Sequence, residues 1–143
     1  MSATENKQLV IRQFDLLNEG RVSDAAALWA EKCWNHGREV SPAALERVYA
    51  SLSTLRERHT IHEVVAEGDW VAVRTTCSGV FSQKPEIPVN SGIFSELEPN
   101  GKTYTNQHSH LFRVEHGKIV EHWANRDDLA VAQQFGLELR PKR

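Results

Sequence analysis

The chain has 143 residues, a formal net charge of −2 at neutral pH, and 40% hydrophobic residues. This length and composition predict one globular domain over residues 1–143, with a core that needs neither disulfides nor a structural metal. Lys and Arg are scattered and no apolar run approaches about 20 residues, so we expect neither nucleic-acid binding nor a membrane span.

The N-terminal segment and the two cysteines both bear on location. Residues 1–10 are polar and acidic, whereas a secretory signal is basic and then apolar. Cys33 and Cys77 lack the spacing of a metal site and are interpreted as buried thiols. We therefore expect a cytoplasmic protein.

Helical periodicity dominates the first third of the chain. The predicted helices cover residues 4–19, residues 23–29, and a segment that begins at Pro42 and carries apolar residues to Leu55. Ser2 and Ser41 precede two of these segments as N-caps. The run from Arg56 to His59 is interpreted as a solvated helix end.

Residues 33–36 are predicted as a short strand between the second and third helices. If the strand is extended, Trp34 and His36 point to one side, and Cys33 and Asn35 point to the other.

After residue 58 the period of the apolar residues changes to two. The predicted strands cover residues 59–66, 70–81 and 93–97, followed by a hairpin over residues 103–126. Asp127 or Asp128 is expected to cap a last helix that runs through Phe135. Helices followed by consecutive strands indicate the α+β class, with a curved sheet whose concave side the helices cover.

The hairpin over residues 103–126 is the most informative stretch, because it holds four of the seven histidines. A three-residue loop closed by Gly117 pairs His110 with His122 and Phe112 with Val120. A two-residue turn instead shifts the pairing by one and pairs His110 with Trp123.

In the first of these registers, one face of the hairpin is an unusual mixture of groups. It carries an amide, three imidazoles and a few apolar side chains: Asn106, His108, His110, Phe112, Val120, His122 and Ala124. Leu111, Ile119 and Trp123 fall on the other face. The mixed face is too polar for a core and too apolar for a solvent-exposed surface, which predicts the floor of a pocket.

Several segments together carry a family resemblance. They are ENKQLVIRQFDLLNEG, CWNHG, VAEGDWVAVRTTCSG, EPNGKTYT, HLFRVEHGKIVEHW, RDDL and QQFGL. With these segments the chain resembles a SnoaL-like polyketide cyclase of the nuclear-transport-factor-2-like superfamily. The resemblance implies a cone-shaped α+β barrel, in which a curved antiparallel or mixed sheet is wrapped by three N-terminal helices and a short C-terminal helix. It also implies a deep apolar cavity and a homodimer.

The resemblance further implies an aldol-type ring closure of a small apolar, polyketide-like or cyclic molecule, without a cofactor or a metal. It places a histidine on each strand of the final hairpin, so His110 and His122 are the predicted catalytic residues. The cyclases carry an aspartate base two residues after the second histidine, and this chain has Ala124 there. The candidate ligand-binding residues are Trp34, His36, Tyr49, Asn106, His108 and Phe112.

Three other interpretations stay open. His108, His110 and His122 offer three neutral nitrogens to Zn²⁺ or Fe²⁺, although side chains two apart on a flat strand lie roughly 7 Å from each other. A non-catalytic binding domain for a small apolar molecule would explain Ala124. A hydroxylase-like or isomerase-like activity is compatible with the same fold.

Overall fold

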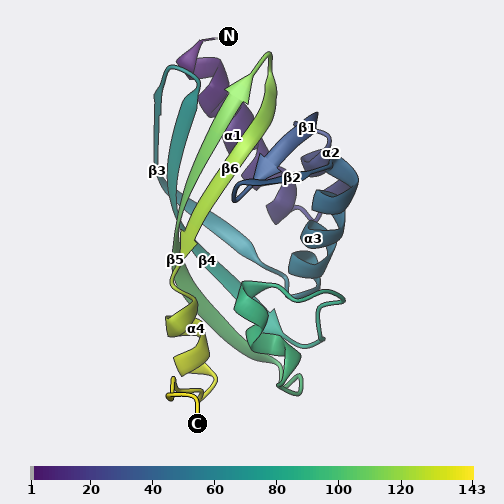
Figure 1. Cartoon of the computed structure of the whole chain (residues 1–143), viewed down its shortest axis with the longest axis vertical. Coiled ribbons are helices and arrows are strands. Elements are labelled where there is room, and N and C mark those ends of the chain that lie inside the picture. Colours follow the sequence, from purple (N-terminus) through teal and green to yellow (C-terminus); the bar gives the residue numbers. More distant parts are fainter. Residues whose placement is uncertain (1) are drawn as a thin grey trace.

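The computed structural model describes residues 2–143 as a strongly bent six-stranded sheet with helices against one side (Figure 1). The helical elements are α1 (Ala3–Asn18), α2 (Val22–Ala26), α3 (Pro42–Thr54), the 3₁₀ helix η1 (Asn90–Ser95) and α4 (Asp128–Gln134). The strands are β1 (Trp29–Asn35), β2 (Arg38–Val40), β3 (Arg58–Glu67), β4 (Trp70–Phe81), β5 (Lys102–Glu115) and β6 (Lys118–Arg126).

The sheet has the strand order β2-β1-β6-β5-β4-β3 and does not close into a complete barrel. All neighbouring strands are antiparallel except β1 and β6, which are parallel. This mixed sheet confirms the predicted α+β cone. No helix among residues 2–143 combines the length and apolar character that a membrane span requires.

The helix N-termini follow the predicted capping chemistry. The Ser2 hydroxyl accepts a hydrogen bond from the Glu5 amide at 3.1 Å, and the Ser41 hydroxyl accepts one from Ala44 at 3.2 Å. The second helix is shorter than predicted, because Trp29 begins strand β1 beside β6 instead of ending a helix. Pairing with the sheet outweighs the weak helical preference of so short a segment.

The central hairpin has the predicted faces but not the predicted register. His116 and Gly117, with φ angles of 50° and 75°, form a two-residue turn that pairs Glu115 with Lys118. A bulge at Val120 then adds a second one-residue shift. The two shifts add up to two residues, so His110 pairs with Ala124 instead of His122. A shift of two residues does not change which face a side chain occupies, so both imidazoles stay on the predicted face.

The bulge also corrects the assignment of two apolar residues. Ile119 pairs with Val114 and belongs to the buried core, so the prediction that it faces outward is wrong. Val120 occupies the bulge and does not face the pocket as predicted. Leu111 and Trp123 do lie on the outer face, where each is about 40% exposed.

Two further segments differ from the prediction. Residues 90–95 form the 3₁₀ helix η1, where a strand had been expected over residues 93–97. In β1, Cys33 and Asn35 face inward; Cys33 is fully buried. The strand ends at Asn35, and the positive φ of His36 turns that side chain toward the same space.

The helices and the sheet enclose the core in two parts. The larger cluster packs α1, α2 and α3 against the concave side of the sheet, with Phe14 and Phe112 at its centre. The smaller cluster, around Phe81 and Phe94, lies where η1 and α4 meet the start of β5. The candidate site lies on the concave face, against α1 and α3.

Candidate functional site

A cavity of about 130 Å³ lies between the concave side of the sheet and helices α1 and α3. Its helical wall is mostly apolar and includes Phe14, Leu17, Leu45, Val48 and Leu52. Its floor is polar and consists mainly of imidazoles from β3, β5 and β6. The predicted pocket floor is therefore present, although the enclosed space would hold only about one aromatic ring.

A second cavity of about 450 Å³ adjoins the first, between α3 and the segment that leads into η1. The two cavities share Val48, Leu52, Asn90 and Arg126 as lining residues. The side chains of these four residues therefore form the boundary between the two cavities.

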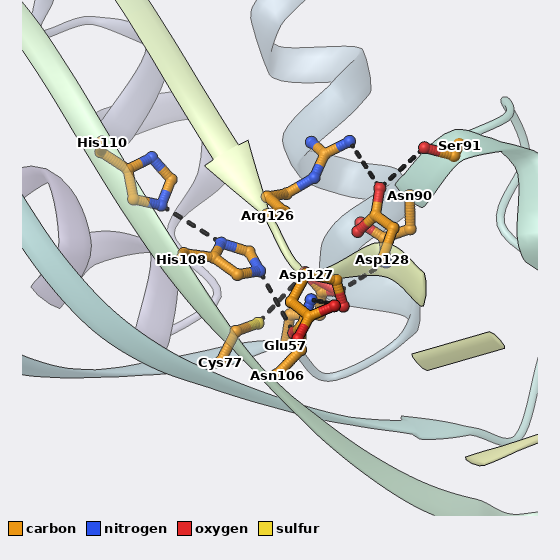
Figure 2. A network of polar contacts seen from close by, with 10 residues as sticks. All are labelled: Glu57, Cys77, Asn90, Ser91, Asn106, His108, His110, Arg126, Asp127 and Asp128. Atoms are coloured by element: carbon orange, nitrogen blue, oxygen red, sulfur yellow. Dashed lines mark hydrogen bonds and ion pairs between the residues drawn. The ribbon is translucent and has the colours of Figure 1, made fainter. Parts of the chain in front are cut away.

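Three imidazoles on the floor form a continuous chain of close contacts between polar atoms. His122 Nδ1 lies 2.8 Å from the Asn35 side-chain oxygen, and His122 Nε2 lies 2.9 Å from His110 Nδ1. His110 Nε2 lies 3.2 Å from His108 Nδ1. His108 Nε2 ends the chain 3.2 Å from the Asn106 side-chain oxygen (Figure 2).

Burial keeps these imidazoles neutral. It lowers the pKa of His108 and of His122 to about 3, with neighbouring imidazoles and Arg126 as smaller causes. Burial, followed by the charge of His122, lowers the pKa of His110 well below its ordinary value. Near neutral pH each ring therefore has one N–H and one lone pair to place.

Four of the six predicted ligand-binding residues line the cavity: His36, Tyr49, His108 and Phe112. Tyr49 hydrogen-bonds the Gln13 carboxamide at 2.7 Å. Trp34 does not line the cavity, because β1 turns the opposite face inward. Asn106 lies behind His108 and orients its ring instead of lining the space.

Glu57 is a pocket residue that the sequence analysis placed at a solvated helix end. Its side chain is buried, with 9% of its surface exposed, and it lines the inner cavity. Asn90 Nδ2 and the Tyr104 hydroxyl donate to one carboxylate oxygen at 2.8 and 2.7 Å. The Cys77 thiol donates to the other at 3.4 Å (Figure 2). Burial raises the pKa of Glu57, while these three donors oppose the rise.

His59 is the second residue that the sequence analysis did not place in the site. Its Nδ1 lies 3.0 Å from the buried Thr75 hydroxyl, and its backbone N–H donates to the Asn18 side chain at 2.7 Å. Burial lowers the pKa of His59 to about 4. Glu57, His59 and Ile61 are alternate residues and would share one face of a strand that begins before the predicted one. This alternation is the sequence signal that could have identified Glu57 and His59 as site residues.

Tyr104 depends on a glycine for its position beside Glu57. A Cβ atom on Gly79, the cross-strand partner of Tyr104, would lie 2.4 Å from the phenol ring. We expect Gly79→Ala to destabilise the fold by about 1–3 kcal/mol, because the ring must move within a packed core. Denaturant unfolding measures this, with exposed Ser78→Ala as the control; equal stabilities of the two variants would contradict the expectation.

Arg126, Asp127 and Asp128 follow the capping interpretation. The Asp127 carboxylate accepts from the Ala130 amide at 3.1 Å, as the N-cap of α4. Arg126 pairs with Asp128 at 3.1 Å while lining both cavities (Figure 2). Ala124 also lines the inner cavity, so the position that carries an aspartate in the cyclases faces the site.

Two groups of side chains on the floor have the composition of metal ligands. One nitrogen each from His59, His108 and His110 lies within 4.8 Å of the others, and so do the ligand atoms of Glu57, His59 and Cys77. The three-histidine set differs from the one considered in the sequence analysis, because His59 replaces His122.

Solved structures with a similar fold come from several bacteria. AclR from Streptomyces galilaeus, a candidate hydroxylase, has a TM-score of 0.76 and 23% identity, and the match covers 99% of this chain and 87% of AclR. TsrD from Streptomyces laurentii has a TM-score of 0.78 and 20% identity, with 96% and 99% coverage. IdmH from Streptomyces antibioticus, a candidate polyketide cyclase, has a TM-score of 0.73 and 21% identity, with 92% and 99% coverage.

Curated protein sequences give no match to this chain. The sequence model of one family, described as SnoaL-like polyketide cyclase, matches residues 8–135 and thus most of the chain. The structural neighbours agree in fold with that match. The chain therefore belongs to the SnoaL-like polyketide cyclase family.

Proposed function

We propose that this protein binds a small apolar, polyketide-like or cyclic molecule in its internal pocket and catalyses proton transfer at carbon, as in an aldol-type cyclisation. The observation that carries this proposal is a set of neutral imidazoles and one buried carboxyl in a pocket whose helical wall is mostly apolar. Deprotonation of carbon requires a base within hydrogen-bond reach and a donor for the developing enolate. The family implies this chemistry without a cofactor.

His110 and His122 are proposed as the histidines that act on the substrate, as the family resemblance implies. Both line the cavity, and the 2.9 Å contact between them allows a proton taken up by one ring to pass to the other. Glu57 is proposed as the acid–base group in place of the aspartate missing at Ala124. Its carboxyl lines the same cavity, and its pKa is raised by burial.

A cyclic ketone in D₂O tests this proposal directly. We expect the protein to exchange the α-protons of α-tetralone for deuterium, as followed by NMR, because a base in the pocket would form the enolate. His110→Ala and His122→Ala should each slow the exchange at least tenfold, or about 1.4 kcal/mol. His62→Ala, at an exposed position on β3, is the control. A smaller loss in both folded pocket variants would argue against a chemical role for these rings.

A second candidate function is binding without catalysis. The observation in its favour is that both ring nitrogens of His110, and both of His122, already contact protein groups. A binding protein would hold α-tetralone without exchanging its protons, so the same experiment separates the two functions. Hydroxylation and isomerisation remain alternatives within the superfamily, and the likeness to AclR supports the former only at the level of fold.

We also propose a homodimer, as the family resemblance implies, and a cytoplasmic location, as the N-terminal segment and the cysteines predict. The cross-strand pair Leu111 and Trp123 supports the dimer, because both side chains are exposed on the outer face of the sheet.

A further inference from the structure

We propose that His59, His108 and His110 form a binding site for a divalent transition-metal ion such as Zn²⁺, on the floor of the inner cavity. The proposal goes beyond the proposed function, which requires no metal. It rests on how the protons of the imidazole chain are distributed and on where the remaining lone pairs converge.

The first step is a count of protons. The chain from Asn35 through His122, His110 and His108 to Asn106 contains four contacts, and an amide oxygen stands at each end. Three neutral imidazoles supply only three N–H groups. Asn106 is held in its orientation because its Nδ2 donates to the Asp127 carbonyl at 3.3 Å. With the Asn35 oxygen facing His122, as in this structure, one of the four contacts lacks a proton.

The second step assigns the three protons, and one assignment leaves this contact between His108 and His110. His122 Nδ1–H can donate to Asn35, His110 Nδ1–H to His122, and His108 Nε2–H to Asn106. This arrangement leaves the lone pairs of His108 Nδ1 and His110 Nε2 facing each other at 3.2 Å (Figure 2). A cation between the two nitrogens turns this repulsion into attraction.

The third step brings in His59 as a further ligand. With Nδ1–H donating to Thr75, His59 has its Nε2 lone pair to offer, and no hydrogen bond to that nitrogen is found among residues 2–143. One nitrogen from each of the three rings lies within 4.8 Å of the others. The ring centroids form a nearly equilateral triangle with sides of 5.1, 5.3 and 5.6 Å.

This geometry is close to that of a three-histidine zinc site. Nitrogens bound to tetrahedral Zn²⁺ at about 2.1 Å lie roughly 3.4 Å apart. The 3.2 Å separation of the His108 and His110 nitrogens is close to this value, and the His59 nitrogen must approach by at most about 1.4 Å. The flat-strand argument against sharing an ion through His108 and His110 fails, because their nitrogens meet at 3.2 Å.

The surroundings also suit a metal ion. The outer nitrogen of each ligand ring contacts an acceptor, on Thr75, Asn106 or His122, which is the support that metal-binding histidines usually have. Glu57 offers a carboxylate oxygen within 4.8 Å of a His59 nitrogen and can supply the opposing charge. The cavity leaves a fourth coordination position for water or a ligand oxygen.

Metal titration of the untagged, EDTA-treated protein tests the site without any need for turnover. We expect one equivalent of Zn²⁺ to bind in calorimetry, and Co²⁺ to give the visible absorption of a four- or five-coordinate ion. His108→Ala, His110→Ala and His59→Phe should each weaken Zn²⁺ binding at least tenfold. The phenyl ring in His59→Phe keeps the packing against Phe14 without a nitrogen, and His62→Ala is the control.

Asn35→Asp provides a second, independent measurement. Rotation of the Asn35 carboxamide would supply the missing proton to the chain, whereas a carboxylate offers only acceptors. If the proton count is right, this variant should bind Zn²⁺ at least as tightly as the original protein. No Zn²⁺ binding at 100 µM by the folded protein, or binding that all three ligand variants retain, would overturn the proposal.

Discussion

Acidification of the metal-free protein from pH 7 to pH 5 is expected to lower its free energy of unfolding by at least about 4 kcal/mol. The cause is the set of buried imidazoles. The pKa is lowered to about 4 in His59 and to about 3 in His108 and His122, and it lies well below the ordinary value in His110.

The sign follows from proton binding in the two states. The ordinary pKa of histidine is about 6.5, so the unfolded chain takes up protons on these histidines as the pH falls below this value. The folded chain takes them up only at a much lower pH. The stabilisation is therefore complete above pH 6.5 and is lost as the pH falls toward the folded-state values. Each ring contributes up to about 1.4 kcal/mol per pH unit in this range.

Other charged groups near the rings change how steeply the free energy of unfolding depends on pH, but they do not reverse the sign of this dependence. Arg126 faces the same cavity and also disfavours protonated imidazoles, and the pKa of His36 is lowered by burial. Glu57 acts in the opposite direction, because its raised pKa lets the folded chain take up one proton on acidification. One opposing group does not cancel four.

Urea unfolding in EDTA at pH 7, 6 and 5 measures the effect. The slope of the free energy of unfolding against pH gives the number of protons taken up on unfolding. His59→Gln should lower this number by up to one, whereas His62→Ala, at an exposed position, should leave it unchanged. A free energy of unfolding that stays constant between pH 7 and pH 5 would show that the imidazoles are not buried as described.

Glu57→Gln is expected to slow the α-proton exchange of α-tetralone at least 100-fold. The substitution removes the only carboxyl group that lines the inner cavity among residues 2–143, and a positioned acid or base typically contributes a factor of this size. Burial raises the pKa of Glu57, which makes its carboxylate a stronger base.

The amide in Glu57→Gln has nearly the same shape and still accepts a hydrogen bond from Tyr104. The same carbonyl oxygen keeps the hydrogen bond from Asn90, because Asn90 and Tyr104 donate to one oxygen of Glu57. The NH₂ group cannot accept from Cys77, so we expect a loss of about 1–2 kcal/mol in stability and a folded protein. Glu63→Gln, an exposed glutamate on β3 that pairs with Arg74, is the matched control. Full exchange activity in folded Glu57→Gln would remove this residue from the proposed mechanism.

Local chemistry was sufficient to predict most of the elements. Serine caps, an N-terminal proline and apolar stripes located α1 and α3, and the period of two located β3, β4 and the hairpin. The family resemblance then supplied the cone. The segment at residues 93–97 was predicted wrongly, because five residues without a clear period carry too little information to distinguish a strand from a 3₁₀ helix.

The sequence also predicted which face of the hairpin each side chain occupies, because successive side chains along a strand point to opposite faces. His108, His110, Phe112 and His122 share the pocket face as predicted, even though the turn and the bulge each shifted the pairing by one. The register itself depended on those two local features, and a bulge such as that at Val120 has no distinctive sequence signal.

Only the tertiary structure decided how the site is composed. Glu57 and His59 lie in a charged run that resembles a solvated helix end. They become pocket residues because β3 begins there and packs under α1, and because Asn90 of η1 donates to Glu57. The 3.2 Å approach of His108 to His110 likewise depends on how the bent sheet turns neighbouring side chains toward one another. Alternation along a strand says which side a group faces, but distances between groups on different strands are set by the curvature of the whole sheet.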